Sequence, residues 1–345
     1  MKNILWFYNC LTCGGAEYGM RDMFDILSHN GYKIYCNIIN QDFSDNDMVK
    51  NFSSIENLEF ICRDMAIDLV NKGFFNFVIN GIDNIEIKEI ENARKNNSFN
   101  LYQFVELMCA VNANDLKRYD AIISPTFSCY KTNNSKKKVL FRGVAKDFLV
   151  DPDVKNRIID KFGICGKKVI GRTGNISWIK FKKEDTLCFL SNFLNANKDW
   201  VYFIVGDYGS DLNLLLDFYK ENGIDTSRLI FSGKYQRNEV WNFLSCMDVF
   251  FYTPLAESFG YVIVEAMMCG VPVVTTNVGA IPETIINGEN GFIVNPNKTE
   301  DLRVIQDLIY NKNNIKNIIT ENAKKFAYSR HNFEDYSKNV LDLFK

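Results

Sequence analysis

The sequence has little of several residue types that would point to other classes of protein. Only two histidines, His29 and His331, occur in 345 residues, and the ten cysteines follow no paired spacing. Cys10 and Cys13 form a Cys-x-x-Cys, but no second pair or histidine cluster stands nearby to complete a zinc site. The sequence therefore predicts free thiols in a reducing cytosol and no structural metal.

Long apolar runs and charge of one sign are also missing. No apolar stretch reaches the roughly 20 residues that span a bilayer, and no signal-peptide pattern opens the chain. A formal net charge of −2 without a polybasic tail gives no electrostatic case for a nucleic-acid partner. The lysine run at residues 136–138 predicts a solvated loop, with contact to an anionic lipid or an acceptor as the alternative. We expect a cytoplasmic protein that is either free or peripheral at a membrane.

Nucleotide-binding motifs of two other protein classes are absent. No Gly-x-Gly-x-x-Gly follows the first predicted strand, which argues against a dinucleotide oxidoreductase. Residues 163–168 lack the spacing of a Walker motif and the Ser or Thr that should follow its lysine.

Apolar runs and helical segments alternate along the chain in two series. The first series predicts a helix at 16–30 and strands at 4–8, 33–39, 74–79, 101–105, 121–124 and 139–141. The second series predicts strands at 168–172, 201–205, 229–231, 248–252 and 271–275. Strands that alternate with helices predict parallel, doubly wound sheets, and residues 148–152 are the predicted linker between two domains.

The most informative local feature is a pair of glutamates, Glu257 and Glu265, with seven residues between them. Glu257 follows the apolar run 249–252, and Glu265 falls on a helix predicted between Gly260 and Gly270. The free N–H groups and positive dipole end of such a helix form an anion site. Glu265 would lie about 7.5 Å along the helix axis from Gly260, because each helical residue rises about 1.5 Å. This spacing suits a diphosphate at the helix mouth with a sugar on each side; the plainer alternative is a capped helix with a half-buried glutamate.

The surrounding sequence resembles the donor-site signature of retaining family-4 glycosyltransferases, the glycosyl transferases group 1. The resemblance runs almost unbroken from about Gly233 to Val294 and is much weaker over the first 150 residues. It rests on residues 254–260, 265–267, 270–274, 279–283 and 287–292. It implies the GT-B fold, in which two Rossmann-like domains face each other across a cleft. The acceptor-side domain would be residues 1–148, the donor-binding domain 149–330, and a last helix within 331–345 would cross back to the first domain.

The resemblance also implies roles for residues of the second predicted domain. Arg172 and Lys180 would stabilise the leaving diphosphate, because negative charge builds on its bridging oxygen; Lys182 or Lys183 is the alternative to Lys180. Glu257 would hold a hydroxyl of the transferred sugar, and Glu265 would hold the ribose hydroxyls. The other predicted donor-binding residues are Gly233, Lys234 and Tyr235 beside the nucleobase, Ser258 in the loop, and Phe259, Gly260, Tyr261 and Val262 through backbone N–H groups.

Fewer assignments carry over to the first predicted domain. Gly14 and Gly15 follow the first predicted strand and resemble the family's Gly-Gly loop beside the donor. Many relatives place a histidine near the reacting centre, but neither histidine of this chain stands at that position. Gln103 and Glu106 are the candidates for the acceptor side.

The resemblance predicts a metal-independent retaining glycosyltransferase that moves a sugar from a GDP- or UDP-sugar to an acceptor hydroxyl of a glycan or a lipid- or protein-linked saccharide. The Asp-x-Asp at 151–153 resembles a metal-binding motif of the other glycosyltransferase architecture, but it falls in the predicted linker. Two alternatives remain, a nucleotide-sugar 2-epimerase on the same fold and a non-catalytic glycan-binding or partner subunit. An epimerase is expected to offer histidine and acidic residues in the cleft, and a partner subunit is expected to lose the charged donor-site residues. The oligomeric state is not indicated.

Overall fold

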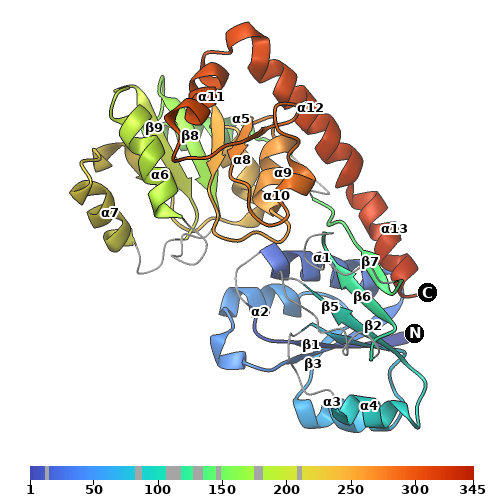
Figure 1. Cartoon of the computed structure of the whole chain (residues 1–345). Coiled ribbons are helices and arrows are strands. Elements are labelled where there is room, and N and C mark those ends of the chain that lie inside the picture. Colours follow the sequence, from blue (N-terminus) through green and yellow to red (C-terminus); the bar gives the residue numbers. More distant parts are fainter. Residues whose placement is uncertain are drawn as a thin grey trace. The chain divides into compact units, whose positions relative to one another are not determined.

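The computed structural model describes residues 1–11, 15–81, 88–105, 118–126, 135–144, 149–174, 182–207 and 212–345. The chain forms two compact units, and each is built around one parallel β-sheet (Figure 1). The first unit contains Met1–Gly143 and Phe333–Lys345, and the second contains Val144–Asn332. The predicted fold class, two doubly wound α/β sheets in tandem, is confirmed.

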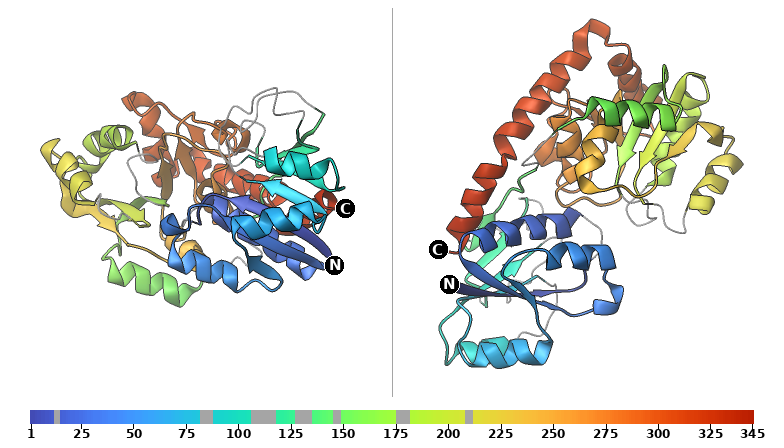
Figure 2. Two further views of the ribbon diagram at one scale, coloured as in Figure 1. Left: turned by 90° about the horizontal axis from the view of Figure 1, so that it is seen from below. Right: turned by 180° about the vertical axis from the view of Figure 1, so that it is seen from behind.

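The sheet of the first unit has seven strands in the order β3-β2-β1-β4-β5-β6-β7. The strands are β1 (Lys2–Tyr8), β2 (Tyr32–Ile38), β3 (Leu58–Phe60), β4 (Phe77–Asn80), β5 (Asn100–Phe104), β6 (Ala121–Ser124) and β7 (Lys137–Val139). The helices are α1 (Gly15–His29), η1 (Gln41–Phe43), α2 (Asn46–Ser53), α3 (Arg63–Asn71), α4 (Lys88–Arg94) and α13 (Phe333–Leu343). Figure 2 shows the last helix, α13, lying beside α1.

Alternate side chains of β1 point to opposite faces of the sheet, and helices cover both faces. Ile4 and Trp6 point into a core shared with α1, α2 and α13, whereas Leu5 and Phe7 point into a core shared with α3 and α4. A strand buried on both faces reads as a continuous apolar run, which is why β1 was predictable from its sequence.

The sheet of the second unit has six strands in the order β10-β9-β8-β11-β12-β13. The strands are β8 (Lys168–Thr173), β9 (Trp200–Val205), β10 (Leu229–Phe231), β11 (Val249–Tyr252), β12 (Val273–Thr275) and β13 (Phe292–Ile293). The α-helices are α5 (Pro152–Lys161), α6 (Lys183–Phe189), α7 (Leu212–Glu221), α8 (Val240–Leu244), α9 (Tyr261–Met268), α10 (Ile281–Thr284), α11 (Thr299–Ile309) and α12 (Ile315–Arg330). A π-helical turn, η3 (Leu190–Leu194), continues α6, and short 3₁₀ turns are η5 (Thr226–Arg228), η6 (Arg237–Glu239) and η7 (Lys312–Asn314).

Three local predictions differ from the structure. β7 begins at Lys137, so two of the three consecutive lysines lie in a strand at the sheet edge rather than in a loop. Edge strands often carry lysine, which discourages pairing with another chain. β4 begins at Phe77, three residues late, because Phe74 and Phe75 pack edge-on against Tyr35 in the preceding turn. The predicted linker ends in a helix, since Pro152 is the first residue of α5.

Among the described residues, no helix combines the length and the apolar character needed to cross a membrane.

Candidate functional site

The carboxyl ends of β8, β9 and β10 are each followed by a glycine with positive φ. These are Gly174 at 107°, Gly206 at 151° and Gly233 at 76°. Gly206 and Gly233 form an isolated bridge, and a Cβ on Gly206 would lie 2.3 Å from the carbonyl oxygen of Gly174. The backbone turns therefore approach each other more closely than a side chain at Gly206 would permit.

Helix α9 begins beside Gly174. Its N-cap residue, Gly260, has φ 84° and ψ 54°, a left-handed conformation that glycine adopts without steric cost. A Cβ on Gly174 would lie 3.7 Å from a methyl group of Val262, in the first turn of α9. The closeness of Val262 to Gly174 places the first turn of α9, the positive end of its dipole, beside the carboxyl end of β8. The predicted helix between Gly260 and Gly270 is confirmed.

Glu257 anchors the loop that leads into α9. Its Oε2 accepts a hydrogen bond of 2.9 Å from the Tyr252 hydroxyl, and its Oε1 accepts the backbone N–H groups of Ser258 at 3.0 Å and Phe259 at 3.3 Å. The Glu257 carboxylate thus occupies an anion position made by two consecutive N–H groups. Because Phe259 N–H is one of the groups predicted to meet the diphosphate, that contact requires Glu257 to move.

Arg172 lies in β8 and is almost fully buried, at 1% exposure. Its guanidinium carbon lies 5.2 Å from the centre of the Tyr252 ring. Burial and the adjacent Glu257 carboxylate raise the pKa of Tyr252 well above its usual range, and Arg172 partly opposes this. Arg172, Tyr252 and Glu257 are therefore one connected group that joins β8, β11 and the loop before α9.

Of the three lysines considered as the second cation, Lys180 lies outside the described residues. Lys182 forms an ion pair of 2.9 Å with Asp185, whose side chain is 4% exposed. Lys183 lies 4.3 Å from the centre of the Phe218 ring. Both alternatives are thus engaged within the second unit, and the choice between them and Lys180 stays a prediction.

The turn after β10 carries the residues predicted to flank a nucleobase. Lys234 is exposed, whereas the centre of the Tyr235 ring lies 5.5 Å from that of Phe243. The contact of Lys234 and Tyr235 with a nucleobase stays a prediction. Arg237, which the sequence did not single out, lies three residues after Lys234, with its guanidinium carbon 5.5 Å from the centre of the Tyr261 ring. This brings the Arg237 cation to the first turn of α9. No motif marks Arg237, because its position beside Tyr261 comes from the tertiary fold.

Glu265 lies in the second turn of α9 and is 6% exposed. Burial, with the Glu265 carboxylate one turn away, raises the pKa of the Cys269 thiol above its usual range. A buried carboxylate needs hydrogen-bond donors, which fits either a structural role or the predicted contact with ribose hydroxyls. That contact stays a prediction.

In the first unit, Gly14 and Glu106 lie outside the described residues, and Gly15 is the first residue of α1. Gln103 is 4% exposed, and its Oε1 accepts a hydrogen bond of 2.9 Å from Asn80. Asn80 also donates to the Tyr119 hydroxyl at 3.0 Å. Gln103 therefore links the ends of β4 and β5, and its predicted contact with an acceptor stays a prediction.

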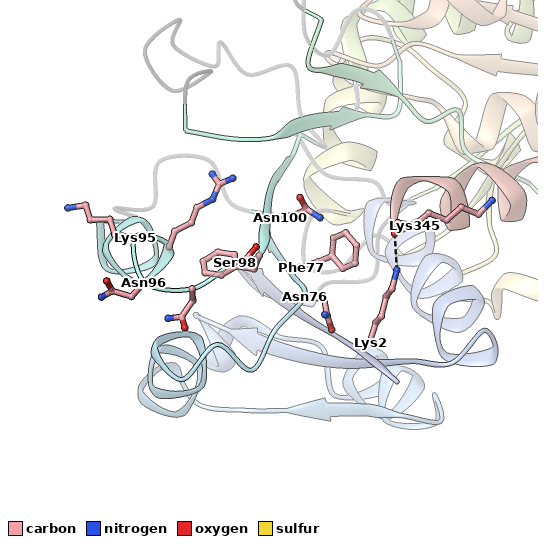
Figure 3. Close-up of a pocket in the computed structure, with 11 residues that line it drawn as sticks. Lys2, Asn76, Phe77, Lys95, Asn96, Ser98, Asn100 and Lys345 are labelled. Atoms are coloured by element: carbon pink, nitrogen blue, oxygen red, sulfur yellow. Dashed lines mark hydrogen bonds between the residues drawn. The ribbon is translucent and has the colours of Figure 1, made fainter.

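A separate cavity of about 700 Å³ opens in the first unit (Figure 3). It lies where β1, β4 and β5 begin, so it is at the opposite end of the strands from Gln103, which lies near the end of β5. Its lining residues are Lys2, Asn76, Phe77, Arg94, Lys95, Asn96, Asn97, Ser98, Phe99, Asn100 and Lys345. None of the predicted site residues is among them.

The described cysteines are free thiols, as predicted. Within the part of the chain that the structure describes, no three Cys, His, Asp or Glu side chains gather as metal ligands would. The predicted independence from metal stays a prediction.

Comparison with known proteins finds a matching family and several relatives. Residues 187–326 match the family Glycosyl transferases group 1. An uncharacterized glycosyltransferase of Methanocaldococcus jannaschii is 29% identical over 211 residues, covering 58% of this chain and 57% of the relative. The alpha-1,3/1,6-mannosyltransferase ALG2 of Dictyostelium discoideum is 25% identical over 207 residues, covering 56% of this chain and 49% of the relative. The chain thus spans about half to three fifths of the length of these curated relatives.

Solved structures resemble the whole chain. A glycosyltransferase from Rickettsia africae aligns with a TM-score of 0.81 at 18% identity, over 100% of this chain and 98% of that one. HepE of Anabaena, solved in complex with UDP-glucose, aligns with a TM-score of 0.78 at 17% identity, over 99% of both chains. At these identities the likeness establishes the fold, and it confirms the predicted GT-B architecture. Residues 187–326 of this chain, most of the second unit, therefore belong to the glycosyl transferases group 1 family, and the whole chain has the GT-B fold.

Proposed function

We propose that the protein is a retaining glycosyltransferase that moves a sugar from a UDP- or GDP-sugar to a hydroxyl of a saccharide acceptor without a metal ion. The observation that carries the proposal is the connected group Arg172, Tyr252 and Glu257 beside the mouth of α9. It combines a buried cation, a carboxylate and a helix N-terminus near the carboxyl ends of β8 and β11 in the second sheet. A nucleoside diphosphate and a sugar need these three kinds of partner.

The chemical task is to let a nucleoside diphosphate leave the anomeric carbon. Negative charge grows on the bridging oxygen, and a guanidinium in a low-dielectric setting stabilises that charge more strongly than one in water. Arg172 is 1% exposed, so contact with phosphate requires a local rearrangement that uncovers its guanidinium. The first-turn N–H groups of α9 supply further donors to the phosphate oxygens.

Glu257 exchanges partners in this reaction. Before the donor binds, its Oε1 accepts from the N–H groups of Ser258 and Phe259. When phosphate takes over these N–H groups, the carboxylate is released toward a hydroxyl of the transferred sugar. Tyr252 keeps hold of Oε2, because its raised pKa leaves the hydroxyl protonated and able to donate at neutral and mildly alkaline pH.

Retention of anomeric configuration needs no protein nucleophile here. The departing phosphate oxygen accepts the proton of the acceptor hydroxyl as that hydroxyl attacks the same face of the sugar. One C–O bond to phosphate breaks, one C–O bond to the acceptor forms, and the proton passes to the leaving group. This route agrees with the family resemblance.

A structural relative supports a nucleotide-sugar donor. HepE of Anabaena was solved with UDP-glucose, and ALG2 of Dictyostelium is named a mannosyltransferase. The positions of the two histidines do not favour an epimerase, since the side chain of His29 is 65% exposed on α1 and His331 is 1% exposed.

Thermal unfolding against UDP, GDP, ADP and CMP tests the proposal. UDP or GDP should raise the melting temperature, while ADP and CMP should not. The corresponding UDP- or GDP-sugars should then be hydrolysed slowly without acceptor, and Arg172→Ala should abolish most of that hydrolysis. If neither UDP nor GDP binds at millimolar concentration, the proposed function is wrong.

A further inference from the structure

The chain passes between its two units twice, after Gly143 and after Asn332. On the second-unit side of these crossings, the Val144 N–H donates a hydrogen bond of 3.0 Å to the His331 carbonyl oxygen. Val144 and His331 are each 1% exposed. We call this hydrogen-bonded pair the joint. Both connections leave the second unit through it.

The His331 ring contacts the donor loop, residues 257–260. It meets the Phe259 ring edge-on, with the ring centres 5.2 Å apart and the planes at 74°. Phe259 is 4% exposed and lies between Glu257 and Gly260. Such edge-to-face pairs are favoured because the positive ring edge meets the negative ring face. The loop is therefore packed directly against the joint.

The same row of rings continues beyond the loop. Phe259 lies 4.7 Å from Tyr261 at 72°, and the Arg237 guanidinium lies 5.5 Å from the centre of the Tyr261 ring. Phe259 and Tyr261 flank Gly260, and the left-handed turn at Gly260 brings their rings together. A continuous packed row thus runs from His331 through the donor loop to Arg237.

We propose that His331 is a positioning residue that couples occupancy of the donor loop to rigidity of the joint. The inference rests on the proposed function. When phosphate takes the Phe259 N–H from Glu257, it also binds the first turn of α9, so the ligand ties the Phe259 backbone to the helix and fixes the Phe259 ring against His331. The His331 backbone carbonyl is the acceptor for Val144, so ordering the ring also orders the hydrogen bond of the joint. A ligand that orders one packed element orders its neighbour in the same way.

Hydrogen exchange at the Val144 amide, combined with calorimetric affinity for UDP and GDP, tests this coupling. In the wild-type protein, whichever nucleotide binds should slow exchange at Val144. His331→Ala should remove that protection and weaken affinity about 3- to 10-fold, the scale of one aromatic pair. His331→Phe keeps an aromatic edge toward Phe259 and should retain both effects. Phe259→Leu, which keeps apolar volume but removes the ring, is the second disrupting variant and should resemble His331→Ala.

Ile319→Ala is the matched control, because Ile319 is a buried residue, at 1% exposure, of α12, the helix that His331 caps. It should lower the melting temperature but leave nucleotide-dependent protection of Val144 intact. Equal loss of protection in Ile319→Ala would mean that general destabilisation is the cause and would overturn the inference. Unchanged protection in both His331→Ala and Phe259→Leu would overturn it as well. If the wild-type protein binds neither UDP nor GDP, the proposed function fails and takes the inference with it.

Discussion

Gly260 adopts φ 84° and ψ 54° at the start of α9, and Gly260→Ala forces a side chain into this conformation. The left-handed region costs an L-residue about 1–2 kcal/mol. The new Cβ would lie 3.3 Å from Cδ1 of Ile263 and 3.4 Å from Cγ of Glu257. The substitution therefore strains the turn and presses on the carboxylate proposed to hold the sugar.

Gly223→Ala is the matched control for the backbone cost. Gly223 has φ 76°, and no heavy atom lies within 4 Å of its ideal Cβ. Gly223→Ala should lose about 1–2 kcal/mol of unfolding free energy, and Gly260→Ala should lose no more than this. Gly260 lies in the loop proposed to bind the nucleotide. In Gly260→Ala the free loop can relax the strain by leaving the left-handed conformation, and nucleotide binding must then force the loop back into it. The loss of nucleotide affinity is therefore bounded by that strain, at about 5- to 30-fold.

Calorimetric titration of UDP and GDP into the wild-type protein and both variants measures this difference, with thermal unfolding as the record of stability. Gly260→Ala should bind 5- to 30-fold more weakly (by about 1–2 kcal/mol), and Gly223→Ala should bind as the wild type does. Equal losses of nucleotide affinity in the two variants would mean that lower stability, and not the donor loop, is the cause. Unchanged affinity in Gly260→Ala would show that the nucleotide binds elsewhere.

Three further changes test separate parts of the reasoning. Arg172→Ala should slow donor hydrolysis by about 100-fold or more, the scale for losing one donor to a developing oxyanion, and an unchanged rate would remove Arg172 from the mechanism. Glu265→Ala should weaken nucleotide affinity by about tenfold without preventing folding, and equal affinity in calorimetry would refute the ribose contact. Burial raises the pKa of Tyr202 from 10.0 to about 12. The unfolded tyrosine ionises first, so about 3 kcal/mol of stability should be lost as the pH rises from about 10 to about 12. In Tyr202→Phe, the unfolding free energy from denaturant titrations should fall less between these pH values. A pH dependence identical to that of the wild type would contradict the raised pKa of Tyr202.

The strands that were predictable are those buried on both faces. β1 and β9 read as continuous apolar runs because each neighbours two other strands and has helices above and below. β3 and β13 were missed because they are three and two residues long, lie at sheet edges and are only half-buried. A strand of two or three residues is too short to show an alternating apolar pattern, so it is recognised only by its pairing with the neighbouring strand.

The helix start at Gly260 was predictable because its signals are local, whereas its role as a donor site stays a prediction. Glu257, Gly260 and Glu265 lie within nine residues of one another, so a helix start and a spacing were enough to place them. Arg237 and Gly174 could not be found in this way. Arg237 reaches the site through its packing on Tyr261, and Gly174 reaches it through the register of adjacent strands.

The hydrogen-bond partners of Glu257 are known only from the structure, because no sequence motif specifies them. A family signature records that a glutamate precedes the helix, but it does not show that the carboxylate accepts the N–H groups of Ser258 and Phe259. Leaving two such groups without an acceptor at a half-buried turn would cost about 1–3 kcal/mol each. In the proposed reaction, phosphate replaces the carboxylate at the same groups, so the turn keeps an anionic acceptor in both states. The donor then has to compete only with a tethered carboxylate, and the carboxylate it displaces becomes free to bind the sugar.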